Sequence, residues 1–160
     1  MGFSASGILS DTSATDRLGA RLANVLHAGD CVLLSGQIGA GKSHLVRALI
    51  RALFNAEGIA QPDIPSPTYT LVQTYELARG TVWHADLYRL GDASEIAELG
   101  LDEAFDTDIT LVEWPEVIEN PPGHALRITL SPYGNGRKVE LSSDSQRWSD
   151  LADLLDGVDA

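Results

Sequence analysis

Apolar residues recur along the chain with two spacings, one typical of amphipathic helices and the other of buried strands. Helical spacing predicts helices over residues 15–27 and 42–54 and from about 145 to 156, with Thr15 as the N-cap of the first. Short apolar runs predict strands over residues 31–35, 70–75, 81–86, 109–113, 125–130 and 138–141. Strands mixed with helices in this way are typical of an α/β fold.

Turn-forming residues separate these elements. The turn at 78–80 and the segment Gly134-Asn135-Gly136 both predict β-hairpins. The segment 92–95, Asp-Ala-Ser-Glu, reads as a capping box that opens a short helix. Three prolines between residues 61 and 68 favour an extended loop. With no repeat or linker, the 160 residues are expected to form one domain, with a core at about 14–141 and a C-terminal helix at about 145–156.

A glycine-rich segment follows the predicted strand at 31–35 and opens the helix at 42–54. Its residues are Gly36, Gln37, Ile38, Gly39, Ala40, Gly41, Lys42 and Ser43. They fit the phosphate-loop pattern G-x-x-x-x-G-K-[ST], in which backbone N–H groups surround the phosphates. Lys42 is expected to reach the β- and γ-phosphates, and the Ser43 hydroxyl to bind Mg²⁺. The strand before and the helix after supply the context that this motif needs. The sequence therefore predicts a P-loop NTPase domain with a mixed, largely parallel sheet flanked by helices.

Carboxylates at strand ends are the candidate partners of the phosphate loop. Glu113 closes the apolar strand at 109–113, so it is the best candidate for a second Mg²⁺ ligand. Asp86 closes another strand and is the second candidate acid, with a turn-capping role as the alternative. Thr68 lies in the proline-rich loop, where a hydroxyl either senses the γ-phosphate or only forms a turn. His44 and His84 are expected to be structural or solvated.

Composition limits the partners and the compartment. With 23 acidic and 11 basic residues the net charge is −12, so direct binding to nucleic acid is expected to be weak. Cys31 is the only cysteine, which excludes an internal disulfide and a cysteine-based zinc site. Neither a signal peptide nor a membrane-spanning stretch is expected. These features together favour a cytoplasmic protein.

Five segments occurring in order resemble one known family. They are 14–19 (Ala-Thr-Asp-Arg-Leu-Gly), the phosphate loop 36–43, 66–72 (Ser-Pro-Thr-Tyr-Thr-Leu-Val), 84–90 (His-Ala-Asp-Leu-Tyr-Arg-Leu) and 111–115 (Leu-Val-Glu-Trp-Pro). The set is similar to TsaE, the ATPase component in bacterial biosynthesis of the tRNA threonylcarbamoyladenosine modification. The resemblance covers about residues 14 to 140.

The resemblance implies a role for each matching residue. Lys42 would hold phosphates, Ser43 and Glu113 would hold Mg²⁺, Thr68 would belong to a switch-like loop, and Asp86 would be needed for hydrolysis. The residues expected near the nucleotide, besides the loop itself, are Thr15, His44, Trp114 and Arg137. The resemblance also implies ATP as the nucleotide, TsaD and TsaB as protein partners, and contact with tRNA only through that complex. ATP hydrolysis would then reset the TsaD–TsaB transferase between cycles.

Two other functions remain open at this point. A small-molecule kinase would also fit a one-domain P-loop protein, although the chain has no arginine-rich segment typical of a lid over the phosphates. A non-catalytic, nucleotide-dependent assembly module is the other alternative. The two strand-end carboxylates, Asp86 and Glu113, favour an enzyme over such a module.

Overall fold

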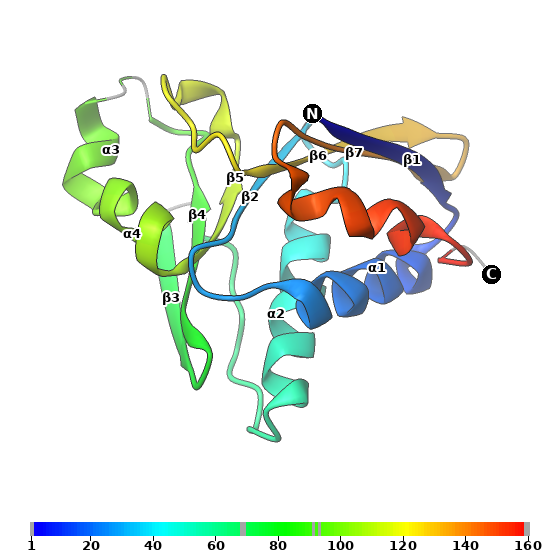
Figure 1. Cartoon of the computed structure of the whole chain (residues 1–160), viewed down its shortest axis with the longest axis horizontal. Coiled ribbons are helices and arrows are strands. Elements are labelled where there is room, and N and C mark those ends of the chain that lie inside the picture. The colour runs from blue at the N-terminus through cyan, green and yellow to red at the C-terminus, as the bar shows by residue number, and fades with distance from the viewer. Residues whose placement is uncertain (1, 68–69, 91, 93, 159–160) are drawn as a thin grey trace.

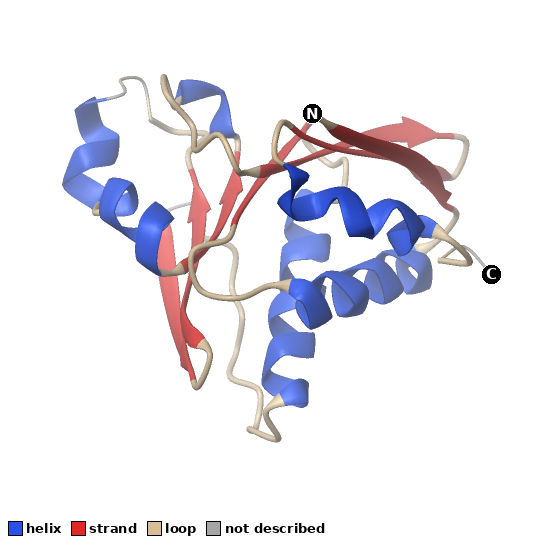
Figure 2. Cartoon of the chain, viewed as in Figure 1, coloured by secondary structure: helices blue, strands red, loops and turns tan. Residues whose placement is uncertain are grey.

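The computed structural model describes residues 2–67, 70–90, 92 and 94–158. Within this part of the chain (Figures 1 and 2) the helices and strands are, in sequence order, β1 (Phe3–Leu9), α1 (Thr12–Val25), β2 (Cys31–Gly36), α2 (Lys42–Ala56), β3 (Val72–Leu77), β4 (Gly80–Asp86), α3 (Ser94–Leu99), α4 (Leu101–Thr107), β5 (Ile109–Glu113), the 3₁₀ turn η1 (Pro115–Val117), β6 (Leu126–Tyr133), β7 (Gly136–Ser143) and the 3₁₀ helix η2 (Gln146–Leu155). None of these helices is long and apolar enough to cross a bilayer.

The described strands form one seven-stranded sheet in the order β1-β7-β6-β2-β5-β4-β3. The four central strands β6, β2, β5 and β4 pair in parallel, and the outer pairs β1–β7, β7–β6 and β4–β3 are antiparallel. The prediction of a mixed α/β sheet is confirmed, as are both hairpins. Because parallel strands end at the same edge, the carboxyl ends of β2, β4 and β5 meet there, which is where α/β proteins place their sites.

Helices cover both faces of the sheet, as the alternation of side chains along β2 shows. Val32 and Leu34 belong to a core cluster with α1, α2 and η2, whereas Cys31 and Leu33 belong to a second cluster with α3 and α4. Successive side chains of a strand point to opposite faces, so the two clusters lie on opposite sides. Figure 1 shows the same division, with α3 and α4 on one side of the strands and α1, α2 and η2 on the other.

Helices α1 and α2 approach each other closely at Gly19. A Cβ atom added there would lie 2.9 Å from both the Cβ of Ala48 and the backbone nitrogen of Leu49. Only a residue without a side chain allows this distance. The close packing fixes α2, and with it the phosphate loop at its N-terminus, against the first helix.

Several boundaries differ from the sequence-based expectation. Helix α1 begins at Thr12, and its N-cap is Asp11, whose carboxylate accepts a hydrogen bond from Ala14 N at 2.9 Å. The prediction of Thr15 as N-cap is therefore wrong; both residues are good caps, but Asp11 stands where the extended backbone ends. The predicted C-terminal helix does start after Ser145, but it is a 3₁₀ helix.

Strand β1 and helix α4 were not predicted. The strand Phe3–Leu9 has no strict alternation of buried and exposed residues, and its partner β7 lies at the other end of the chain. The segment after residues 92–95 contains two short helices, α3 and α4, in place of one. The pairing of β1 depends on a distant segment, whereas α3 and α4 are separated at Gly100, which has a φ of 84°.

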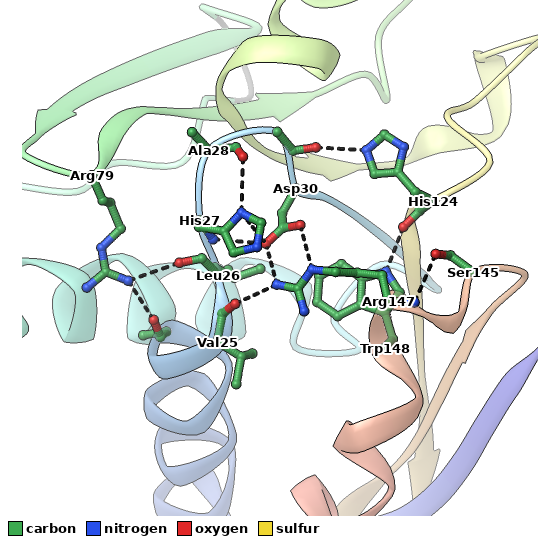
Figure 3. Close-up of polar contacts among 12 residues, drawn as sticks. Val25, Leu26, His27, Ala28, Asp30, Arg79, His124, Ser145, Arg147 and Trp148 are labelled. Carbon is green, nitrogen blue, oxygen red and sulfur yellow. Dashed lines mark hydrogen bonds and ion pairs between the residues drawn. The ribbon is translucent and has the colours of Figure 1, made fainter.

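A polar cluster at the amino end of the sheet ties η2 to α1 (Figure 3). Arg147 donates to both carboxylate oxygens of Asp30, at 3.2 and 2.8 Å, and to the carbonyl of Val25 at 2.7 Å. Trp148 is fully buried and donates to the carbonyl of His124 at 2.6 Å. Arg79 donates to the carbonyls of Ala23 and Leu26. Two arginines from elsewhere in the chain thus satisfy the C-terminal carbonyls of α1, which has no basic residue in its own last turn.

Candidate functional site

The candidate site begins where β2 turns into α2 through the glycine-rich loop. Gly41, the N-cap of α2, has φ 103° and ψ 11°, a left-handed conformation that favours glycine. The first hydrogen bond of α2 runs from Leu45 N to Gly41 O at 3.0 Å. The N–H groups of Lys42, Ser43 and His44 therefore have no acceptor within the helix, and together with the helix dipole they favour an anion at this end.

Lys42 lies folded into the loop with only 5% of its surface exposed. Its Nζ donates to the carbonyl oxygens of Gly36 and Gln37 at 2.6 and 2.9 Å, and lies 4.1 Å from the centroid of the Trp114 ring. Burial lowers the pKa of Lys42, while the nearby carboxylates of Glu113, Glu116 and Asp86 oppose this shift. The loop thus holds a cation that its surroundings solvate poorly and that an anion would stabilise.

A chain of three side chains runs from the start of α2 across two strands. Ser43 Oγ donates to Glu113 Oε1 at 2.7 Å, and His84 Nε2 lies 2.6 Å from Glu113 Oε2. Glu113, the last residue of β5, is 2% exposed, and His84 on β4 is completely buried. The carboxylate is therefore held on both oxygens.

This donor set fits Mg²⁺. A hydroxyl and a carboxylate oxygen, 2.7 Å apart, are hard oxygen donors of the kind that Mg²⁺ prefers. Among the described residues, no group of three or more His, Cys, Asp and Glu side chains could hold a metal ion by itself. An ion bound by Ser43 and Glu113 would take its other ligands from phosphates and water, which is typical of Mg²⁺ at nucleotide sites.

Asp86 and Trp114 lie beside this pair. Asp86 closes β4 in register with Glu113 on β5, and its Oδ1 accepts a hydrogen bond from Tyr88 N at 3.0 Å. Trp114 has φ 57° and ψ 58°, which is a strained conformation for a bulky residue. Its ring contacts that of Tyr88, with centroids 4.7 Å apart. Backbone strain of this kind concentrates at functional sites.

These groups line one open cavity of about 430 Å³. The volume is within the range of small-molecule sites. The residues that line it are Ile38, Gly39, Gly41, Lys42, Ser43, His44, Arg47, Asp86, Tyr88, Glu113 and Trp114. The structure thus brings together most of the site residues predicted from the sequence.

Thr15 and Arg137 line a second cavity, of about 440 Å³, which shares Gly41 and His44 with the first. Arg137 comes from β7 and donates to the carbonyls of Ala40 and Gly39 at 2.9 and 3.0 Å. These two hydrogen bonds tie the phosphate loop to β7. The predicted nucleotide-binding residues that line a cavity are therefore divided between these two adjoining cavities.

The remaining predicted residues have other positions. Gly36, Gln37 and Ala40 form the loop, and their carbonyls accept hydrogen bonds from Lys42 and Arg137. His44 lines both cavities, and its Nε2 lies 2.8 Å from Asp16 Oδ1. Thr68 lies outside the described residues. Leu71, shortly after it, has a positive φ of 69°.

Three residues at the site have a position or a contact that the sequence did not reveal. Arg47, one turn into α2, lines the first cavity, and its spacing of four residues from Ser43 along the helix could have indicated it. Tyr88 lines the same cavity from the turn after β4. His84, expected to be structural or solvated, is buried and contacts Glu113 on the neighbouring strand, a contact that no local pattern reveals.

The phosphate loop lies between β2 and α2, and the neighbouring strand β5 ends in Glu113. On a sheet whose central strands are parallel, this arrangement defines the fold of a P-loop NTPase. The family model of the Threonylcarbamoyl adenosine biosynthesis protein TsaE matches residues 9–139. The chain therefore belongs to the TsaE family.

Relatives from several bacteria support this assignment. The chain is 42% identical over 151 residues to the tRNA threonylcarbamoyladenosine biosynthesis protein TsaE of Rickettsia felis, a match that covers 92% of this chain and 85% of the relative. It is 34% identical over 132 residues to the protein of the same name from Haemophilus influenzae, which covers 78% of this chain and 80% of the relative. The crystal structure of Bacillus subtilis YdiB has the same fold, with a TM-score of 0.76 and 24% identity over 100% of this chain and 99% of that one.

Proposed function

We propose that this chain is a magnesium-dependent ATPase that acts in the biosynthesis of tRNA threonylcarbamoyladenosine. The names of its relatives support the pathway. The observation that carries the chemistry is the pair Ser43 and Glu113, held 2.7 Å apart beside Lys42 at the mouth of a phosphate loop. A loop that only bound phosphate would not need a buried carboxylate facing its hydroxyl.

Each residue has a proposed task in this reaction. Lys42 leaves the loop carbonyls to bind the β- and γ-phosphates, and the free N–H groups of α2 bind the same oxygens. Ser43 and Glu113 hold Mg²⁺, which when bound neutralises charge on the phosphate oxygens. Asp86, next to Glu113, serves turnover more than binding.

The second cavity is proposed to take the nucleoside. Thr15, His44 and Arg137 surround a hollow that is continuous with the loop through Gly41. Arg137 is already engaged with two loop carbonyls, so it would shape the loop and also border the nucleotide. Trp114 covers Lys42 on the other side.

Protein partners are part of the same proposal. TsaD and TsaB are proposed to bind this chain, to stimulate its hydrolysis of ATP and to be reset by it. The net charge of −12 supports contact with tRNA through those partners and not directly. A cytoplasmic location follows from this role, since bacterial tRNA is modified there.

Hydrolysis of ATP by the purified chain with Mg²⁺, with and without TsaD and TsaB from the same organism, tests the proposal. We expect slow turnover alone and a clear increase with the pair. Turnover at full speed that is indifferent to the pair would contradict the partner role. A phosphorylated metabolite as product would instead identify a small-molecule kinase, and nucleotide-dependent binding without turnover would identify an assembly module.

A further inference from the structure

Glu113 can rotate about its side-chain bonds, so something must fix which oxygen faces Ser43. Glutamate has three such bonds, and each rotamer would direct the carboxylate to a different place. Ser43 alone provides one hydrogen bond to Oε1. That hydroxyl is also the group expected to bind Mg²⁺, and a single hydrogen bond to one oxygen does not fix where the other oxygen of the carboxylate lies.

His84 holds the other oxygen. Its Nε2 lies 2.6 Å from Glu113 Oε2, and both side chains are buried from solvent. An ionised carboxylate only accepts hydrogen bonds, so Nε2 must carry the proton and donate it. His84 Nδ1 has no hydrogen-bond partner among the described residues. With the proton on Nε2, Nδ1 is an unpaired acceptor, and no N–H donor of the ring is left buried without a partner.

The strand positions make this contact a rigid one. His84 lies opposite Leu111 in the parallel pair β4–β5, two residues before Glu113, and on the face of the sheet that packs against α2. The imidazole comes from the middle of a buried strand, whereas Ser43 comes from the end of the loop. One carboxylate oxygen is thus fixed to the core, and the other is presented to the cavity.

We infer that His84 is a positioning residue, which fixes Glu113 Oε2 so that Oε1 faces Ser43 and the Mg²⁺ of the bound nucleotide. The inference rests on the proposed function, because it needs a metal–nucleotide complex at this site. Partners that orient a metal ligand in this way typically change metal affinity about 10- to 100-fold when they are removed.

Two variants separate positioning from a purely structural role. His84→Leu keeps an apolar side chain of similar size and removes the donor, whereas His84→Gln keeps an N–H donor at a similar reach. The matched control is Thr110→Val, a change from a buried polar residue to an apolar one on β5. Thr110 lies an odd number of residues from Glu113 and so faces the other side of the sheet.

The measurement is the affinity for ADP and for a non-hydrolysable ATP analogue, by titration calorimetry across a series of Mg²⁺ concentrations and in EDTA. For His84→Leu we expect the Mg²⁺ concentration at half-saturation to rise about 10- to 100-fold, with the affinity in EDTA unchanged. His84→Gln should recover most of the loss, and Thr110→Val should behave like the wild type. An equal loss of affinity with and without Mg²⁺ would reduce His84 to a structural residue and overturn the inference.

A wild-type measurement covers the case in which His84→Leu does not fold. In protein labelled with ¹⁵N-histidine, the His84 ring should carry its proton on Nε2, and its signals should shift when Mg²⁺ is added to the nucleotide complex. A proton on Nδ1, or signals indifferent to Mg²⁺, would overturn the inference. Wild-type protein whose nucleotide binding ignores Mg²⁺ would overturn the proposed function as well, which distinguishes the two failures.

Discussion

Two buried carboxylates lie at opposite ends of the parallel strands, and their surroundings differ. Asp30, just before β2, accepts hydrogen bonds from Arg147 on both oxygens and from His27 N, and it lies in the cluster of Figure 3. Glu113, at the end of β5, has one bond to the core through His84 and one to Ser43 at an open cavity. Both oxygens of Asp30 are hydrogen-bonded to groups inside the protein. One oxygen of Glu113 is hydrogen-bonded to the core, and the other to Ser43, which a ligand in the cavity can also contact.

The difference indicates what each end of the sheet is for. The amino end joins α1, η2 and the loop containing His124 by hydrogen bonds that leave little to satisfy. The carboxyl end has three features that cost stability. Lys42 is a charged side chain whose burial disfavours its charge, and the backbone of Trp114 has a left-handed conformation. The first N–H groups of α2 have no acceptor within the helix. Such costs are typical of binding sites. Changes at the amino end should therefore affect folding, and changes at the carboxyl end should affect chemistry.

The largest expected effect is on turnover at Asp86. Asp86→Ala should keep ATP affinity and lower kcat roughly 100- to 10,000-fold, because a positioned acid or base contributes that much. Asp86→Asn, which keeps an acceptor for Tyr88 N, tests whether charge is what matters. The control is Glu98→Ala, exposed on α3. Unchanged turnover in steady-state kinetics would remove Asp86 from the mechanism.

The next effect is on folding at the amino end. Arg147→Ala should lower the free energy of unfolding by about 3 kcal/mol, the low end for a broken buried pair, because Asp30 is buried while Arg147 is 29% exposed. Arg127→Ala is the matched control, since its partner Asp144 is exposed and such pairs contribute about 1 kcal/mol or less. Urea unfolding measures both. A variant as stable as the control would show that the cluster does not hold η2 in place.

A change at Lys42 should affect ligand binding more than folding, the reverse of the change at Arg147. Lys42→Met should weaken ATP binding about 10- to 100-fold, because it removes a charged donor to the phosphates. Its free energy of unfolding should stay within about 1 kcal/mol of the wild type, since burial already disfavours the charge. Lys138→Met, on a half-exposed position of β7, is the control. Calorimetric titration and urea unfolding together decide; a large loss of stability would contradict the contrast between the two ends.

The smallest effect is at Cys31, the first residue of β2, which directly follows Asp30 at the amino end. Burial raises the pKa of its thiol from 9.0 to about 12, so the thiolate needed for reaction is rare at pH 8. We expect a thiol reagent to label the folded protein at no more than the rate of unfolding, and the urea-unfolded protein at once. Rapid labelling of the native protein would show that this region opens more easily than the packing indicates.

Local patterns in the sequence were sufficient for much of the fold and the site. The strand–loop–helix around Gly36–Ser43 could be predicted because each part depends on neighbouring residues: glycine for φ, an apolar run for β2 and a helical stripe for α2. The same holds for β5 ending in Glu113 and for both hairpins. Local patterns could not predict β1, whose partner β7 lies more than 120 residues further along the chain.

The phosphate loop, the acids at strand ends and the segments shared with one family can be recognised from the amino-acid sequence alone. The contacts between separate elements depend on the packed fold: His84 with Glu113, Arg137 with the loop carbonyls, and Arg147 with Asp30. The physical reason is that a motif is encoded by residues that are neighbours along the chain. The hydrogen bonds that orient it join side chains from separate strands and helices, whose distances only the packed sheet sets.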